Sequence, residues 1–146
     1  MIKENLKMTG SLEIAINGDT VCETHNLVVA VGKEHVTARL RDDGSDGAMS
    51  HMAIGTGTGA AASADTALGT EAVRTVFDAT ADITGTNTIK FVTTFAAVGS
   101  GSDVAVTEAG IFNGASTGTM LARTVFGAVN KGSDDVMTIT WTITVS

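Results

Sequence analysis

The sequence contains no proline and no tyrosine, a single cysteine, and no long apolar run. Because Cys22 stands alone, no disulfide can form within the chain, and we expect this residue to act as a small buried hydrophobic side chain. No segment approaches the roughly 18 apolar residues that a membrane-spanning helix needs. Residues 1–10 carry charges but precede no apolar stretch of the kind that a signal peptide requires. We therefore expect no membrane partner and no secretion by the usual route.

Basic residues are also scarce, because nine Lys and Arg stand against sixteen Asp and Glu and the formal net charge is −7. The basic residues are scattered along the chain. An acidic surface repels DNA and RNA, so no nucleic-acid partner is expected. A chain of 146 residues fits one domain whose core needs neither metal nor disulfide. We expect this domain at residues 11–146, preceded by a mobile N-terminal arm at residues 1–10.

Threonine, alanine and glycine are abundant and make up about two-fifths of the chain. Thr favours pleated, half-buried surfaces, whereas Gly allows tight turns. Residues 136–146 alternate strictly between four threonines and a row of apolar side chains that includes Trp141. Such a period of two predicts a strand. We expect this strand to be central, with Trp141 in the core and the threonines facing solvent or a second subunit.

Further strands are expected from similar alternation between glycine-rich turns. They lie at residues 12–16, 49–54, 73–77, 88–95, 104–112 and 120–129. Asn17-Gly18 predicts a hairpin whose return strand begins near Val21. Residues 33–41 lose the alternation and indicate a short helix over one open end of the sheets. The fold class is therefore all-β, an immunoglobulin-like or jelly-roll-like β-sandwich with one short helix near residues 32–41.

The glycine-rich stretch at residues 53–60 contains Gly55, Gly57 and Ala60, which satisfies a loose dinucleotide-binding spacing. That site needs a helix directly after the glycines, with an apolar side to pack against a sheet. Residues 58–72 offer only Leu68 as a large apolar side chain, so such a helix is not expected. We interpret the glycines as a loop that turns tightly at a crowded junction, and we expect no nucleotide cofactor.

The candidate metal ligands are equally weak. Asp42, Gly44, Asp46 and Gly47 follow part of a calcium-loop pattern, but Gly44 occupies a ligand position and Ala53 replaces the terminal Glu. A solvated acidic turn is the favoured interpretation. The three histidines, at positions 25, 35 and 51, have no metal-ligand spacing. No metal site is predicted.

Catalytic candidates reduce to one carboxylate. Glu108 is embedded in an otherwise apolar strand. It could be a catalytic carboxylate, it could form a salt bridge with Arg123 or Arg74, or it could belong to a β-bulge beside Gly110. The structural roles are favoured, because the sequence contains no nucleophile motif of the G-x-S-x-G kind. We therefore predict no catalytic residues, no cofactor and no enzyme activity.

Several segments combine a glycine turn with an alternating strand, and they follow one another in a definite order. They are NLVVAVGKEHVTARL, MSHMAIGTGTG, DTALGTE, VTEAGIFN, GTMLARTVF and TITWTITV. In their order and spacing, from about residue 12 to residue 145, they resemble a family of small virion structural proteins of tailed bacteriophages. The resemblance implies a β-sandwich that assembles on a phage particle and carries no catalytic residues.

Two places in the virion are consistent with this resemblance: a decoration (cement) protein outside the capsid, or a tail-associated adaptor, tip or fibre-attachment protein. The single short domain, without coiled-coil heptads or a repeated fibre pattern, favours decoration. The expected partners are further copies, as a homotrimer or another symmetric ring, and the major capsid protein or tail proteins. Localisation would be the virion, assembled in the host cytoplasm.

A different hypothesis is a β-sandwich module that binds a host carbohydrate through its loops. Sugar sites commonly use an exposed Trp or Tyr as a stacking platform. Here there is no Tyr, and Trp141 is expected on the core face. The carbohydrate hypothesis is therefore less favoured than the virion role.

Overall fold

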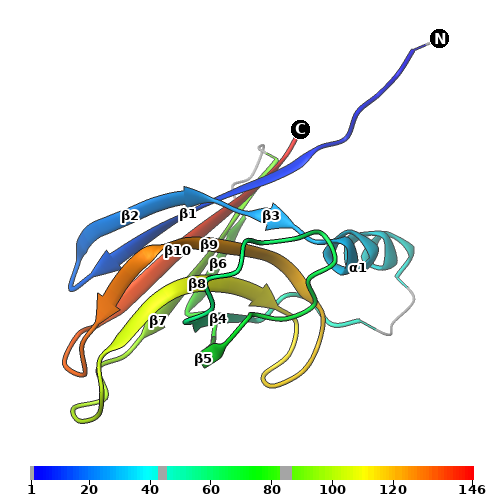
Figure 1. Ribbon diagram of the computed structural model, residues 1–146. Helices are drawn as coiled ribbons and strands as arrows, with labels where there is room; N and C mark the ends of the chain where they lie inside the picture. The colour runs from blue at the N-terminus through cyan, green and yellow to red at the C-terminus, as the bar shows by residue number, and fades with distance from the viewer. Residues whose placement is uncertain (1, 43–45, 83–86) are drawn as a thin grey trace.

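The computed structural model describes residues 2–42, 46–82 and 87–146, and in this part of the chain two antiparallel sheets pack face to face with one helix at their end (Figure 1). The strands are β1 (Met8–Ile16), β2 (Asp19–His25), β3 (Leu27–Val28), β4 (His51–Gly55), β5 (Glu71–Val76), β6 (Ala79–Asp82), β7 (Thr88–Phe95), β8 (Val104–Phe112), β9 (Met120–Lys131) and β10 (Met137–Val145). The helix α1 is Ala30–Arg41. The predicted all-β sandwich with one short helix is confirmed.

Sheet 1 has the strand order β2-β1-β10-β7-β6, so the strand with the clearest alternation is the central one, as predicted. Trp141 of β10 pairs with Leu12 of β1 on one side and with Phe91 of β7 on the other. Its side chain is fully buried, and its indole Nε1 donates a hydrogen bond to Asn26 Oδ1 at 2.7 Å. Burial of the large ring with its N–H group paired is what stabilises an indole in a core.

Sheet 2 has the order β3-β9-β8-β4-β5. One of its faces joins sheet 1 in the main core, which includes Met52, Ile54 and Ile111. The other face carries a second, smaller cluster in which Leu68 packs with Val29, Ala53, Phe112 and Met120. Strands β8 and β9 are therefore buried on both faces over much of their length, and their alternation is correspondingly weak in the sequence.

Some boundaries differ from those expected. Strand β1 begins at Met8, so residues 8–10 of the expected arm belong to sheet 1. Gly10 is buried there, and the position requires glycine because a Cβ would clash with the Asn26 side chain that binds the indole. The short strands β3 and β6 lack enough residues to show a period and were not predicted.

Helix α1 begins at Ala30, slightly earlier than expected, and lies at one end of the sandwich. Gly32 sets its distance from β9, because a Cβ there would clash with the backbone of Leu121. The helix ends where Asp42 adopts a left-handed conformation with φ of 50°. No helix in the described ranges has the length and apolar character needed to cross a membrane.

Candidate functional site

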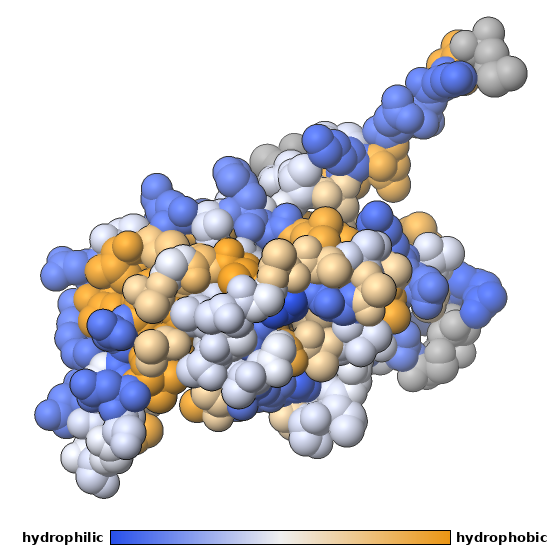
Figure 2. All heavy atoms as spheres, viewed as in Figure 1, coloured by the Kyte–Doolittle hydropathy of each residue, from blue (hydrophilic) through white to orange (hydrophobic). Residues whose placement is uncertain are grey.

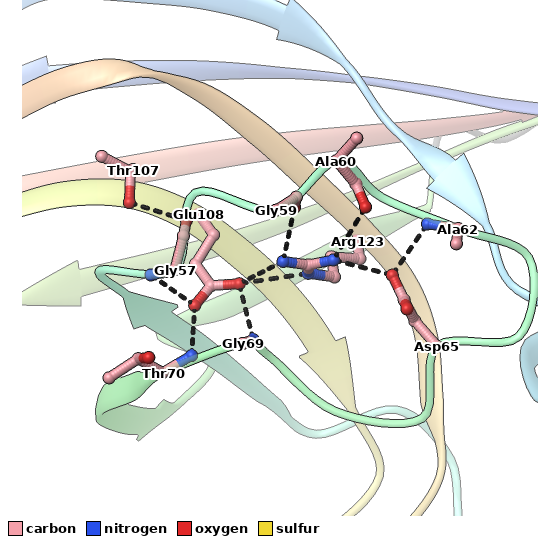
Figure 3. Close-up of polar contacts among 10 residues, drawn as sticks. All are labelled: Gly57, Gly59, Ala60, Ala62, Asp65, Gly69, Thr70, Thr107, Glu108 and Arg123. Atoms are coloured by element: carbon pink, nitrogen blue, oxygen red, sulfur yellow. Dashed lines mark hydrogen bonds and ion pairs between the residues drawn. The ribbon is translucent and has the colours of Figure 1, made fainter.

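Five hydrogen bonds converge on the carboxylate of Glu108, on strand β8 (Figure 3). Its Oε1 accepts hydrogen bonds from the backbone N–H groups of Gly57 at 2.8 Å and Thr70 at 2.7 Å. Its Oε2 accepts from the Gly69 N–H at 2.9 Å and from Arg123 Nη2 at 2.8 Å and Nε at 3.1 Å. The Glu108 side chain is fully buried; its bonds to Arg123 are buried, and its bonds to the three backbone N–H groups are partly buried.

Arg123, on the neighbouring strand β9, extends this arrangement. Its Nη1 donates to Asp65 Oδ2 at 2.7 Å, and its Nη2 donates to the Gly59 carbonyl at 3.0 Å. Asp65 Oδ2 also accepts from the Ala62 N–H at 2.8 Å. Arg123 therefore links a carboxylate in the sheet to a carboxylate in the loop. We call Glu108, Arg123 and Asp65 the carboxylate–arginine cluster.

The electrostatics of this cluster favour full ionisation. Burial alone would raise the pKa of Glu108, but the N–H groups of Thr70 and Gly69, together with Arg123, hold it below the usual range. The backbone N–H of Ala62 and then Arg123 lower the pKa of Asp65. Burial alone would lower the pKa of Arg123, and its two carboxylate partners raise it instead. All three side chains are charged at neutral pH, so the one guanidinium is shared by two carboxylates and the cluster keeps one net negative charge, which the backbone N–H groups stabilise.

The carboxylate–arginine cluster fixes the glycine loop, which we define as residues 56–70, against sheet 2 (Figures 1 and 3). A Cβ at Gly57 would clash with Glu108, and a Cβ at Gly55 would clash with the Thr70 carbonyl. The prediction of glycines that turn tightly at a crowded junction is thus confirmed. No helix follows Gly57, and β4 runs antiparallel to β5 and β8, so the strand–turn–helix unit of a dinucleotide site is absent from these described residues.

The structure contains both a salt bridge of Glu108 and an irregularity in the pairing of its strand. Of the two candidate salt-bridge partners, Arg123 contacts Glu108, while Arg74 pairs with Glu71 at 2.7 Å and lies over the ring of Phe112 at 3.7 Å. The strand pairing of β8 is irregular between residues 106 and 108 and again between residues 111 and 112. The bulge thus directly precedes Glu108.

Asp65 was missed by the sequence reasoning. Its spacing from Ala62 is typical of a turn in which an Asp side chain accepts a local N–H, and that was the available signal. Nothing in the sequence indicates that the same carboxylate would also meet Arg123, which lies 58 residues further along the chain.

The remaining sequence candidates are dispersed. His35 is buried, with its Nδ1 at 3.4 Å from Asp46 Oδ2, and His51 Nδ1 lies 2.8 Å from Ser50 Oγ. Gly44 of the partial calcium pattern lies outside the described residues. Among the described residues, no three His, Cys, Asp or Glu side chains are grouped so as to hold a metal ion. Cys22 packs partly buried against the main core, and burial, with Glu23 beside it, raises the pKa of its thiol.

The outer face of sheet 1 presents a different surface. We call it the threonine face and define it by outward residues of β10, β7, β1 and β2: Thr138, Thr140, Thr142, Thr144, Thr88, Lys90, Val92, Thr94, Thr9, Ser11, Glu13, Ala15 and Glu23. The threonines are exposed or partly exposed. The outer face of sheet 2 is partly covered, by Leu68 of the glycine loop and by Val29 and Val31 at the start of α1. The molecule therefore has one partly covered and one open sheet face.

Charges on the threonine face are few and unevenly placed. Glu13 of β1 stands directly opposite Glu23 of β2, and both are exposed. Like charges in such a cross-strand pair are unfavourable. Glu13 accepts one hydrogen bond, from the Thr20 hydroxyl at 2.8 Å. These two carboxylates and Lys90 border a shallow hollow of about 520 Å³ floored by Thr140 and Thr142.

Comparison with known proteins adds no assignment to this geometry. No protein-family model matches the sequence, and searches of curated proteins and of solved structures gave no significant match.

Proposed function

We propose that this protein is a non-enzymatic structural protein of a tailed-phage virion, which decorates the outside of the capsid and strengthens it. The observation that carries the proposal is the open threonine face of sheet 1, on the side of the sandwich opposite the partly covered outer face of sheet 2. A pleated surface of short side chains brings a partner close to the backbone and loses little side-chain entropy on binding. The segments that resemble phage virion proteins supply the biological setting.

The carboxylate–arginine cluster supports a structural role. Glu108 is fully buried and Arg123 has only 5% of its side chain exposed, so neither side chain is accessible to a substrate. Their hydrogen bonds join β8 to β9 and hold the glycine loop against these strands. A rigid scaffold of this kind suits a protein that must keep its shape on the surface of a particle.

The acidic pair on the threonine face indicates the chemistry of the docking partner. Glu13 and Glu23 repel one another in the free protein, and a Lys or Arg placed between them would relieve the repulsion. We therefore expect the shell surface that receives the threonine face to present a basic side chain near this pair. The net charge of −7 keeps the rest of the surface away from packaged DNA.

The test is binding of the purified protein to empty heads, tailless heads and tails of the phage that encodes it, measured by co-sedimentation. Thr140→Lys adds bulk and a repelling charge at the centre of the face and should weaken head binding at least about tenfold, or about 1.4 kcal/mol. Thr66→Lys, at an exposed position in the glycine loop, is the matched control and should bind as the wild type does. Binding to tails alone, or equal binding by both variants, would refute the proposal.

A further inference from the structure

The first described residues form an arm that points away from the body of the protein (Figure 1). Lys7 and Ser146 exchange two backbone hydrogen bonds, of 2.6 and 2.7 Å, which continue the ladder between β1 and β10. Residues 2–6 lie beyond this last pair and extend from the end of β1. At about 3.3 Å per residue, an extended arm from residue 2 to residue 7 spans roughly 20 Å, enough to reach a neighbouring molecule.

The arm exposes apolar side chains that a lone molecule leaves in water. Ile2 is 98% exposed and Leu6 is 79% exposed, and Figure 2 shows apolar surface both near the tip of the arm and near its base. In an extended chain, Ile2, Glu4 and Leu6 share one side, while Lys3 and Asn5 share the other. The arm therefore has one side with two apolar groups around a carboxylate.

A large apolar depression lies where the arm leaves the body. It consists of two adjoining hollows of about 790 and 650 Å³, whose linings share Met8, Val36, Leu40 and Val145. We call them together the helix-end hollow. Leu40 of α1 is 81% exposed there, beside the other apolar groups of the lining, and contiguous exposed apolar surface of this kind commonly marks an interaction site.

The charges around the helix-end hollow match those of the arm. Lys33 borders one of the two hollows and Arg39 borders the other, and both side chains are exposed. Arg39 uses its Nη1 to donate to the Asp46 carbonyl at 2.9 Å, which holds the guanidinium near the rim. An inserted segment with the pattern apolar–acidic–apolar would bury its apolar groups and bring its carboxylate near one of these cations.

We propose that the arm of one copy binds in the helix-end hollow of a neighbouring copy, with Ile2 and Leu6 buried and Glu4 facing Lys33 or Arg39. Leu6 lies at the rim of its own hollow but stays 79% exposed, and the arm from there toward Ile2 points away from the body, so the occupant of the hollow is the arm of a second copy. Passing each arm to the next copy closes a symmetric ring or dimer. This inference deepens the proposed function, since it identifies the contact by which a virion protein of this kind associates with itself.

Light scattering of the purified protein tests the contact in the absence of capsids. The wild type should be an oligomer at about 100 μM, and the double variant Ile2→Ser/Leu6→Ser should be a monomer with an unchanged melting temperature. The matched control Lys3→Ser/Asn5→Ser alters the opposite side of the arm and should remain oligomeric. A monomeric wild type, or an oligomeric Ile2→Ser/Leu6→Ser variant, would overturn the proposal.

The hollow is tested from its own side. Leu40→Asp should also give a monomer, whereas Val98→Asp, which changes an equally apolar residue that is 67% exposed in the turn between β7 and β8, should not. Both replacements are at exposed positions, so neither should disturb folding. An oligomeric Leu40→Asp variant would contradict docking in the hollow.

Mixing two differently labelled chains identifies the contact between copies directly. In a Cys22→Ser background, one chain carries Ile2→Cys and the other Leu40→Cys. The proposal predicts a disulfide-linked pair of unlike chains on oxidation of the mixture, and absence of that pair would refute it. Thr140→Lys should still form the oligomer, so loss of head binding and loss of the arm contact are separate results.

Discussion

The replacement Glu108→Gln tests whether the carboxylate–arginine cluster determines the stability of the sandwich. Glutamine keeps the shape of the side chain but replaces one oxygen with an NH₂ group. Both carboxylate oxygens accept at least two hydrogen bonds, so either orientation of the amide would set a donor against donors. The replacement also leaves Arg123, with 5% of its side chain exposed, paired with Asp65 alone.

Removing one partner of a buried ion pair costs about 3–5 kcal/mol. For a chain of this size each kcal/mol shifts the melting temperature by about 2–4 °C, so Glu108→Gln should melt roughly 6–20 °C below the wild type. Calorimetry or circular dichroism at pH 7 measures this difference. Limited proteolysis should then cut the glycine loop first, because the loop loses one or two of its three backbone bonds to this side chain, depending on which oxygen the NH₂ group replaces.

Glu71→Gln is the matched control, because Glu71 pairs with Arg74 at 2.7 Å but keeps 33% of its side chain exposed. A pair of that kind is worth at most about 1 kcal/mol. If Glu108→Gln lowered the melting temperature no more than Glu71→Gln does, the stabilising role assigned to the cluster would be refuted. In the double variant Glu108→Gln/Arg123→Met, the buried cation that has lost one of its two carboxylate partners is removed, and part of the lost stability should return.

Three further predictions concern the same scaffold. Gly57→Ala should destabilise the protein by about 1–3 kcal/mol in chemical denaturation, whereas Gly59→Ala, whose Cβ would meet no atom within 4 Å, should be neutral; equal effects would contradict the crowding at Gly57. Trp141→Ala and Phe91→Ala should each cost about 3–5 kcal/mol by the same measurement, because both rings are buried in the core, and a cost below 1 kcal/mol would contradict that packing. The melting temperature should fall as the pH drops below about 4.5, since the lowered pKa of Glu108 means that the folded state binds fewer protons than the unfolded state. If the melting temperature of the wild type changed with pH in this range as little as that of Glu108→Gln, Glu108 would not titrate in this way.

The sequence predicted the parts of the fold that depend on side-chain periodicity. Strand β10 has one buried and one partly exposed face, so apolar and threonine side chains alternate clearly along it. That alternation was enough to predict a strand at the centre of its sheet. Strand β9 is buried on both faces near its start, and its alternation therefore carried no information about which side faces the core. Strands β3 and β6 are too short to show any period.

In the site, only the ion pair between two side chains was predictable from the sequence. An acid inside an apolar strand needs a cation, and Arg123 was one of two candidates named for Glu108. The other partners of Glu108 are backbone N–H groups at residues 57, 69 and 70. Every residue except proline carries that group, so nothing in the sequence distinguishes those positions, and only the path of the folded loop brings them together.

The central place of β10 has a consequence for how the protein is made. Strand β1 is synthesised early, yet its partner β10 follows all other strands of both sheets. The strands of sheet 2 all lie within residues 27–131 and can pair before β10 is synthesised. Leu12 and Ile14, which are buried in the folded protein, stay exposed to water until residues 137–145 have been synthesised. Newly made chains are thus most prone to aggregate through the β1–β2 hairpin, and a chain interrupted before Met137 leaves that hairpin without its neighbour.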